Sequence, residues 1–265
     1  MPIGDHPNQI PLKHNAVIWR YMDIDKYTSL LKKRALFFCR ADKFSDPFEG
    51  TIPKREAEFR IEESRLRAEY LGNTFDEEVA KANIEGLIDL HKRYKRGVII
   101  NCWHINNNES DAMWRLYLKD NEGVAIQSNV QRINQAFEKA KEQIEFSKVR
   151  YLDYENSIWY HPIDYPHKGY NLLTPFFHKR MEFCHEKEYR IYHQIYDAID
   201  NPDYWETQEH NKGKFIDVDL NILIEKIYLP PTIDNSTYQN IVSLTNEYGY
   251  DFVFEKSKLQ SEPYY

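Results

Sequence analysis

The feature that most constrains the fold is a series of short, strand-like apolar runs joined mostly by short connections. The runs lie at residues 17–21, 35–39, 98–103, 123–127, 147–151, 186–193, 214–218, 224–229 and 251–255. Parallel neighbours need a crossover of about a dozen residues or more, usually a helix, whereas antiparallel neighbours do not. The pattern therefore predicts an α+β fold with a mixed, largely antiparallel sheet and flanking helices.

Residues 53–96 interrupt this pattern, because they are rich in Glu, Lys and Arg and have helical periodicity. They predict a helical insert of two helices, the second starting with a capping box from Thr74 to Glu77. Further helices are expected at 26–34, 114–118, 132–146, 174–183 and 236–248. The sequence has no internal repeat and no Pro/Gly/Ser-rich linker, so residues 1–265 are expected to form a single domain.

Composition limits the classes of protein that are compatible with the sequence. An apolar content of 42% supports a real core, and a net charge of −7 argues against a general nucleic-acid coat without excluding a local basic groove. The three cysteines predict neither a disulfide framework nor a zinc knuckle, and suit reduced thiols in the cytoplasm. No export signal and no run of eighteen apolar residues is present, so we expect a soluble, cytoplasmic protein without membrane contact. The oligomeric state cannot be predicted, since an apolar helix face can meet a core or a partner.

The segment Cys184–His193 carries the strongest candidate site. If it is a strand, its period of two places Glu186, Glu188 and Arg190 on one face. Ionised side chains are rarely aligned on a buried face without a partner or a task. The same residues would also fit a charge ladder on a solvated sheet face, because structural ion-pair networks imitate sites.

Two further motifs have plain structural interpretations. Trp114 and Tyr117 lie three residues apart on a predicted helix, where core packing is favoured over ligand stacking. Asp46-Pro47 is typical of a turn at the end of a strand.

Blocks of sequence along nearly the whole chain follow a fixed order. They are Leu36–Phe38 leading into Phe44–Glu49, Met113-Trp114 through Tyr117 to Gly123–Ile126, Glu186–Arg190 and Ile224–Leu229. In type and order they resemble a widespread, mostly bacterial family catalogued as "domain of unknown function 2971". That name supplies no activity, so the chemistry has to come from the residues.

The sequence departs from this family at two places. Ser45 stands where the family usually has Asn, and Trp103-His104 stands where it tends to have a Phe-Ser pair after the central cysteine. If that serine binds a ligand in relatives, either His104 replaces it here or the role is lost.

A second resemblance concerns the opening of the chain. A strand with Trp19-Arg20-Tyr21, a helix over 26–34 and a strand over 36–39 look like the start of ADP-ribosyltransferase-type folds. Glu186-Lys187-Glu188 is similar to the Glu-x-Glu that such folds carry on a later strand. The resemblance implies NAD as a substrate, with transfer of ADP-ribose to a macromolecule or hydrolysis of NAD.

The resemblance also implies a role for each candidate residue. Glu188 would be the catalytic carboxylate beside the ribose, where breaking the bond to nicotinamide creates an oxocarbenium-like centre. Glu186 would orient or deprotonate the acceptor, and Arg20 would hold the ligand through its planar donor fork. The other candidate NAD-binding residues are Tyr21 or Tyr189, which could stack on a ring, with Arg190 and His104.

Other functions remain open at this stage. The acceptor could be a protein, a nucleic acid or water, and the family resemblance suggests a role in phage defence or as a toxin. A metal-dependent nuclease or hydrolase built on His104, His178, His185 and His193 is a rival, although no pair has a recognised metal spacing. A non-enzymatic module could instead bind protein or nucleic acid through the insert, with Lys92, Arg93, Lys95 and Arg96 as its contact patch.

Overall fold

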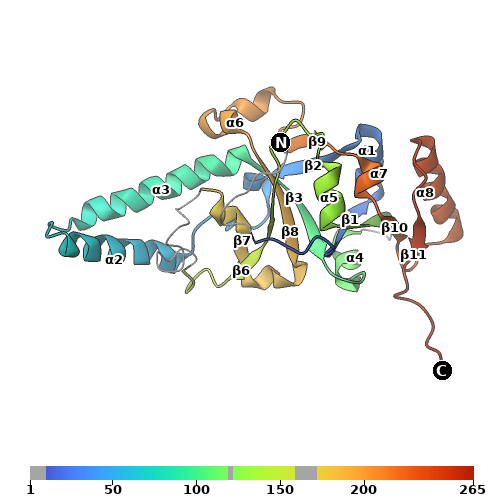
Figure 1. Cartoon of the computed structure of the whole chain (residues 1–265), viewed down its shortest axis with the longest axis horizontal. Helices are drawn as coiled ribbons and strands as arrows, with labels where there is room; N and C mark the ends of the chain where they lie inside the picture. Colours follow the sequence, from blue (N-terminus) through green and yellow to red (C-terminus); the bar gives the residue numbers. More distant parts are fainter. Residues whose placement is uncertain (1–9, 119–121, 159–171) are drawn as a thin grey trace.

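The centre of the protein is a mixed, mostly antiparallel sheet (Figure 1). In the computed structural model, residues 10–118, 122–158 and 172–265 are described. Among them the sheet strands are β1 (Val17–Asp23), β2 (Ala35–Arg40), β3 (Val98–Ile105), β4 (Gly123–Asn129), β5 (Glu145–Lys148), β8 (Glu188–Gln194), β9 (Gly213–Asp217), β10 (Lys226–Leu229) and β11 (Phe254–Lys256). Their main order is β11-β10-β4-β1-β3-β2-β9, and β8 and β5 continue from the other edge of β3. Only β10 and β11 pair in parallel in this described sheet, so the predicted fold class is confirmed.

Eight α-helices lie within the described residues. They are α1 (Ile24–Lys33), α2 (Lys54–Tyr70), α3 (Glu77–Gly97), α4 (Asp111–Tyr117), α5 (Val130–Ala136), α6 (Tyr196–Asp200), α7 (Leu220–Leu223) and α8 (Asn235–Glu247). Short 3-10 segments are η1 (Ala41–Lys43), η2 (Thr174–Phe177), η3 (Met181–Glu186) and η4 (Tyr204–Thr207). Within this part of the chain, no helix combines the length and apolar character needed to span a bilayer.

Alternation along β1 divides the core into two layers. Ile18 and Met22 belong to the main apolar cluster, to which α1, α5, α7 and α8 contribute buried side chains. Trp19 and Tyr21 point to the opposite face and pack with Trp114 of α4. The core position predicted for Trp114 is therefore confirmed.

Helix α1 shows how local sequence fixes the element that follows β1. The Asp23 carboxylate caps its first turn by accepting a hydrogen bond from the Lys26 amide at 2.8 Å. Tyr27, Leu30 and Leu31 are buried at helical spacing. Arg34 then ends the helix in the left-handed conformation, so that β2 can start at the next residue.

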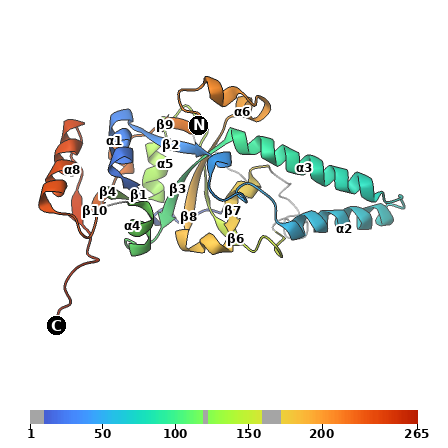
Figure 2. The same ribbon diagram turned by 180° about the vertical axis from the view of Figure 1, so that it is seen from behind.

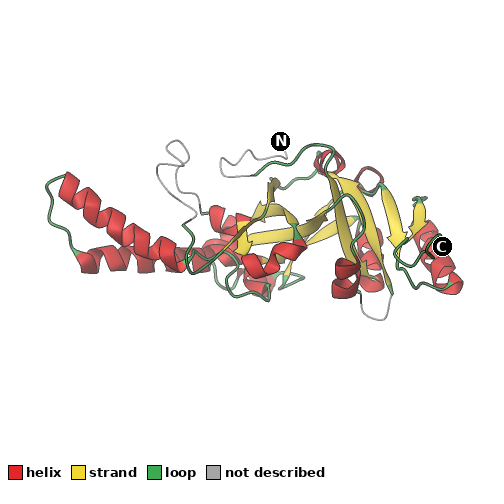
Figure 3. Cartoon of the chain, turned by 90° about the horizontal axis from the view of Figure 1, so that it is seen from below, coloured by secondary structure: helices red, strands yellow, loops and turns green. Residues whose placement is uncertain are grey.

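Helices α2 and α3 form an antiparallel hairpin that extends away from the sheet (Figures 1 and 2). Figure 3 shows the same projection from below, with the turn of the hairpin at its far end. The two predicted helices of the insert are present, but the N-cap of α3 is Asp76 and not Thr74. The Asp76 carboxylate accepts hydrogen bonds from the amides of Glu78 and Val79.

Two helix predictions were wrong because tertiary pairing overrides local periodicity. The helix expected at 132–146 ends at Ala136, since Phe146 lies in β5 opposite Ile191 of β8. The helix expected at 174–183 is replaced by η2, β7 (His178–Arg180) and the start of η3, and β7 pairs in parallel with β6 (Arg150–Leu152). The irregular stretch expected from 159 to 170 lies outside the described residues.

Candidate active site

The sheet splits beside β3. On one edge β3 pairs with β1 at His104 and Ile105, and with β2 at Ile99 and Ile100. Residues 101–103 lie between these two contacts, where no described strand pairs with that edge of β3. Because buried backbone groups need hydrogen-bond partners, this gap has to be filled by side chains or by a ligand.

Arg20 and Asn101 fill part of the split. Arg20 Nη1 donates to the Cys102 carbonyl oxygen at 2.6 Å and to Asn101 Oδ1 at 3.1 Å. Asn101 Nδ2 donates in turn to the Phe37 carbonyl oxygen of β2 at 2.8 Å. A single buried amide therefore connects β1, β2 and β3 across the gap.

The Arg20 charge is not compensated within the described residues. Both of its hydrogen-bond acceptors are neutral oxygens, and no described carboxylate lies within ion-pair distance. Burial lowers the pKa of Arg20, although a guanidinium stays protonated at any physiological pH. A half-buried cation without a counter-ion is suited to an anionic ligand.

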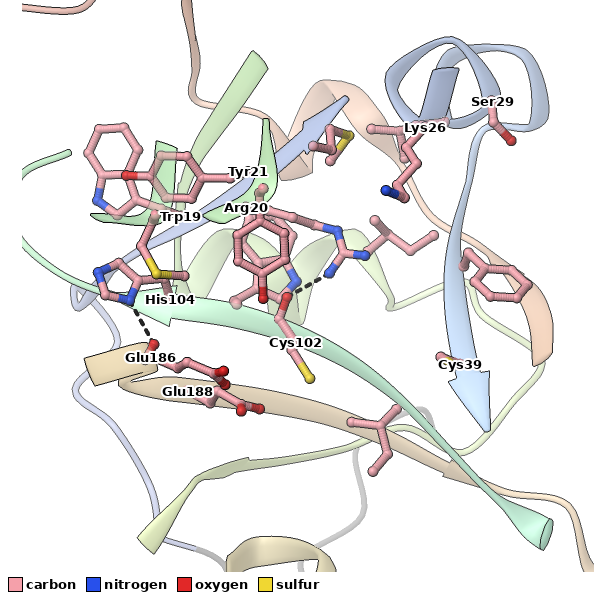
Figure 4. A pocket seen from close by; sticks show the side chains of 18 of the residues that line it. Trp19, Arg20, Tyr21, Lys26, Ser29, Cys39, Cys102, His104, Glu186 and Glu188 are labelled. Atoms are coloured by element: carbon pink, nitrogen blue, oxygen red, sulfur yellow. Dashed lines mark hydrogen bonds between the residues drawn. The ribbon is translucent and has the colours of Figure 1, made fainter. Parts of the chain in front are cut away.

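A pocket of about 570 Å³ opens at the split, within the usual range for small-molecule sites. Its walls include Arg20 of β1, Lys26 and Ser29 of α1, and Phe37 of β2. Glu186 and Glu188 line the same pocket. In Figure 4 the Arg20 guanidinium lies on one side of Cys102 and the two carboxylates lie on the other. The pocket thus brings together the predicted residues Arg20, Glu186 and Glu188, which are far apart in sequence.

Glu188 is an ionised carboxylate held by two cations. Its Oε2 accepts from Arg190 Nε at 2.5 Å, and its Oε1 accepts from Lys179 Nζ at 2.7 Å. Burial favours the neutral acid, but the Arg190 charge, the hydrogen bonds and Lys179 lower the pKa of Glu188 well below its usual range. Its backbone amide also donates to the Tyr151 hydroxyl at 2.8 Å, which fixes the start of β8.

Glu186 lies in a different place from the one predicted. It ends η3, and Lys187 follows in the left-handed conformation (φ 41°), so the strand begins only at Glu188. The Lys179 ammonium connects Glu186 with Glu188, because its Nζ donates to Glu186 Oε2 at 2.5 Å as well as to Glu188. Burial raises the pKa of Glu186 to about 7, and Glu188 adds to this rise while Lys179 opposes it. Near neutral pH the pair consists of one carboxylate and one group that readily gains or loses a proton.

Arg190 and Tyr189, which were also predicted to contact NAD, do not line this pocket. Arg190 is fully buried and donates from both terminal nitrogens to Glu49, at 2.6 and 2.8 Å. Tyr189 points to the other face of β8 and stacks on Phe146 in the main core. The period of two places Arg190 beside Glu188, but it turns Tyr189 away from them.

Tyr21 and His104 lie at one end of the pocket, near Glu186. His104 Nδ1 bonds the Glu186 carbonyl oxygen at 2.7 Å, which makes Nδ1 the donor, and burial lowers the pKa of the ring. The Nε2 atom is then an acceptor that has no hydrogen-bond partner among the described residues. The Tyr21 hydroxyl accepts from the Ser110 amide at 2.8 Å, so its ring is held in place but its hydroxyl is already engaged.

Several site residues were not predicted from the sequence. Glu49 and Lys179 join the carboxylate cluster, Asn101 bridges the split, and Tyr117 lines the pocket although core packing was expected for it. Glu49 closes the Phe44–Glu49 block that carried the family resemblance, which was an available signal for it. Lys179 carried no such signal, because its strand had the pattern of a helix.

Two kinds of chemistry receive no support from the described residues. Among them, no group of three or more His, Cys, Asp and Glu side chains is arranged to hold a metal ion. The Cys102 thiol lines the pocket, but burial and the nearby Glu188 raise its pKa well above the usual value. The thiolate needed for nucleophilic attack is therefore disfavoured.

Comparison with known proteins supports the first of the two sequence-based resemblances. A family described as "Protein of unknown function (DUF2971)" matches residues 113–191, which confirms the predicted resemblance over that stretch. No curated protein has significant sequence similarity to the chain. The solved structure of Thermus sp. 2.9 DarT in complex with ADP-ribosylated ssDNA superimposes with a TM-score of 0.41 and 8% identity, covering 94% of this chain and 98% of that chain. A superposition at this level carries no argument about the activity or the site residues of this chain.

Proposed function

We propose that the pocket binds NAD and that the protein cleaves the bond between nicotinamide and ribose, transferring ADP-ribose to an acceptor or to water. The observation that carries this proposal is the pair of carboxyl groups on the pocket wall. Glu188 is held ionised by two cations, whereas the pKa of Glu186 lies near 7. Adjacent carboxyls with separated pKa values are the usual arrangement for assigning charge stabilisation to one group and proton transfer to the other.

Each group then has a defined task in the reaction. The bond from nicotinamide nitrogen to the ribose carbon breaks, its electron pair leaves with nicotinamide, and positive charge develops on the ribose. A fixed carboxylate at Glu188 stabilises that charge. The acceptor's lone pair forms the new bond to the ribose carbon, and Glu186 takes the proton that the acceptor loses.

Arg20 supports the assignment of an anionic dinucleotide. Its guanidinium lines the pocket without a described counter-ion, and the diphosphate of NAD would supply one. The aromatic rings of Phe37 and Phe215 line the same pocket and offer surfaces for a base. His104 Nε2 remains as an acceptor for an N–H or O–H group of the ligand.

The binding module based on the insert ranks second, because its four cations are engaged within the fold. Lys92 pairs with Asp89 and Arg93 with Asp200, while Lys95 donates to the Pro47 carbonyl oxygen and Arg96 to that of Ile199. Lys92 and Arg93 are therefore paired with carboxylates, which leaves less unpaired positive charge than the sequence suggests.

The test is to incubate the protein with NAD labelled in its adenylate half, in the presence of cell lysate, and to follow labelled macromolecules and free nicotinamide. We expect the wild type to turn over NAD and Glu188→Gln to lose about 100-fold or more of that rate. Glu182→Gln makes the same chemical change on an exposed residue of η3 and should keep full activity. No turnover and no saturable NAD binding by folded wild type would refute the proposal and favour the binding module.

A further inference from the structure

A buried lysine that the proposed reaction does not yet use lies at the centre of the carboxylate cluster. Lys179 Nζ is 2.5 Å from Glu186 Oε2, 2.7 Å from Glu188 Oε1 and 3.7 Å from Glu49 Oε1. The Lys179 side chain is 9% exposed, and its ammonium lies 4.6 Å from the centre of the Phe183 ring. A buried ammonium in contact with three carboxylates affects both their positions and their charges.

Charge counting shows why Lys179 matters to Glu186. The cluster has three carboxylates, Glu49, Glu186 and Glu188, and two cations, Lys179 and Arg190. Arg190 forms hydrogen bonds with Glu49 and Glu188 but neither a hydrogen bond nor an ion pair with Glu186. Lys179 is thus the cation that reaches Glu186, and Glu186 is the carboxyl at which the cluster's excess negative charge can be removed by a proton.

We propose that Lys179 is the positioning residue of this site: its ammonium holds the carboxyl groups of Glu186 and Glu188 together as one unit and places a positive charge beside Glu186. This inference rests on the proposed function, in which Glu186 accepts the proton of the acceptor. Without Lys179, Glu186 stays protonated at neutral pH and acts as a base only at higher pH.

The other titratable groups around the cluster do not supply this property. They come from the elements that pack against the cluster. They are Glu49 of the loop after η1, Cys102 and His104 of β3, Tyr117 of α4, Tyr151 of β6, His185 of η3, and Arg190 of β8. Burial raises the pKa values of Cys102, Tyr117 and Tyr151 and lowers that of His104, so these four are neutral at pH 7. His185 forms neither a hydrogen bond nor an ion pair with Glu186. A measurement on the Glu186 carboxyl carbon reports on Glu186 and not on His185.

The decisive experiment follows the side-chain carboxyl carbon of Glu186 by NMR in glutamate-labelled protein as pH is varied. It needs no NAD turnover, so it distinguishes failure of this inference from failure of the proposed function. In Lys179→Met the titration midpoint of Glu186 should rise by about 1 to 3 pH units, because an opposite charge within hydrogen-bonding distance is lost.

Two further variants make the test specific for charge. Glu49→Gln alone removes a carboxylate and should lower the midpoint. Lys179→Met combined with Glu49→Gln leaves two carboxylates and one cation, the same excess as in the wild type, and should return the midpoint toward the wild-type value. If Lys179→Met does not fold, the direction in which the Glu186 midpoint changes in Glu49→Gln still shows whether the charge balance of the cluster sets that midpoint.

Activity gives a second readout if the wild type turns over NAD. Lys179→Met should keep its KM for NAD, because Arg20 is untouched, while the pH profile of kcat shifts upward together with the Glu186 midpoint. Lys148→Met removes an exposed lysine of β5 and is the matched control. An unchanged Glu186 midpoint in folded Lys179→Met, or a midpoint in Glu49→Gln that does not fall, would overturn the inference.

Discussion

Removal of Glu49 should destabilise the whole fold, because it leaves a buried guanidinium with only one of its two carboxylate partners. Glu49 accepts two hydrogen bonds from Arg190, at 2.6 and 2.8 Å, and both side chains are 0% exposed. Breaking a buried ion pair by removing one partner typically costs about 3 to 5 kcal/mol of folding stability. We expect Glu49→Ala to lie at the low end, about 3 kcal/mol, since Glu188 still pairs with Arg190 and Glu186 can ionise to restore the charge balance.

The assay is urea unfolding at pH 7, followed by tryptophan fluorescence, with unfolding free energies compared at equal m-values. Glu155→Ala is the control, because it removes the Glu155 partner of Lys54 from a pair that is 66% and 69% exposed. Exposed pairs contribute little, so this variant should unfold like the wild type. The reasoning is refuted if Glu49→Ala loses no more stability than Glu155→Ala.

Three further predictions concern the pocket and its supports. Arg20→Met should weaken NAD binding by about 10-fold or more in calorimetric titrations, because a charge-assisted contact is lost, and an unchanged affinity would remove Arg20 from the site. Relative to Glu186→Gln, the wild type should lose about 3 kcal/mol of unfolding free energy between pH 4.5 and 7.5. The folded-state pKa of Glu186 is raised to about 7, so the stability that Glu186 confers is full below its unfolded pKa and is lost as pH rises through the folded pKa. A difference between the two proteins that does not change with pH would contradict the raised pKa. Gly50→Ala should lower the melting temperature more than Gly72→Ala. Both glycines have φ +67°, but only at Gly50 would the new Cβ lie 2.4 Å from the Phe176 ring. Equal falls in melting temperature would show that the Phe176 contact is unimportant.

The sheet was predictable from sequence because its strands are short, apolar and clearly bounded. β1 to β4 lie where the apolar runs placed them, and period two correctly set Arg190 beside Glu188. The helix expected at 174–183 failed because the pairing of β7 with β6 depends on residues nearly thirty positions away.

The candidate site was predictable only in part, for the same physical reason. A strand pattern shows which side chains share a face, but not which face is turned to a pocket, and Tyr189 lies on the face of β8 that packs in the core. Glu49 and Asn101 act through partners that are distant in sequence, at Arg190 and Phe37. Lys179 contacts Glu186 only seven residues away, but across η3, which the sequence did not predict. Such contacts have no local signature in the sequence.

The central claim is tested most directly by single-turnover release of nicotinamide from NAD bound to the wild type and to Glu188→Gln. We expect both proteins to bind NAD with similar affinity, because Glu188 acts on the charge that develops during bond cleavage. Only the wild type should release nicotinamide at an appreciable rate. Equal rates of release, or a loss of NAD binding as large as the loss of rate, would contradict the assignment of Glu188 as the catalytic carboxylate.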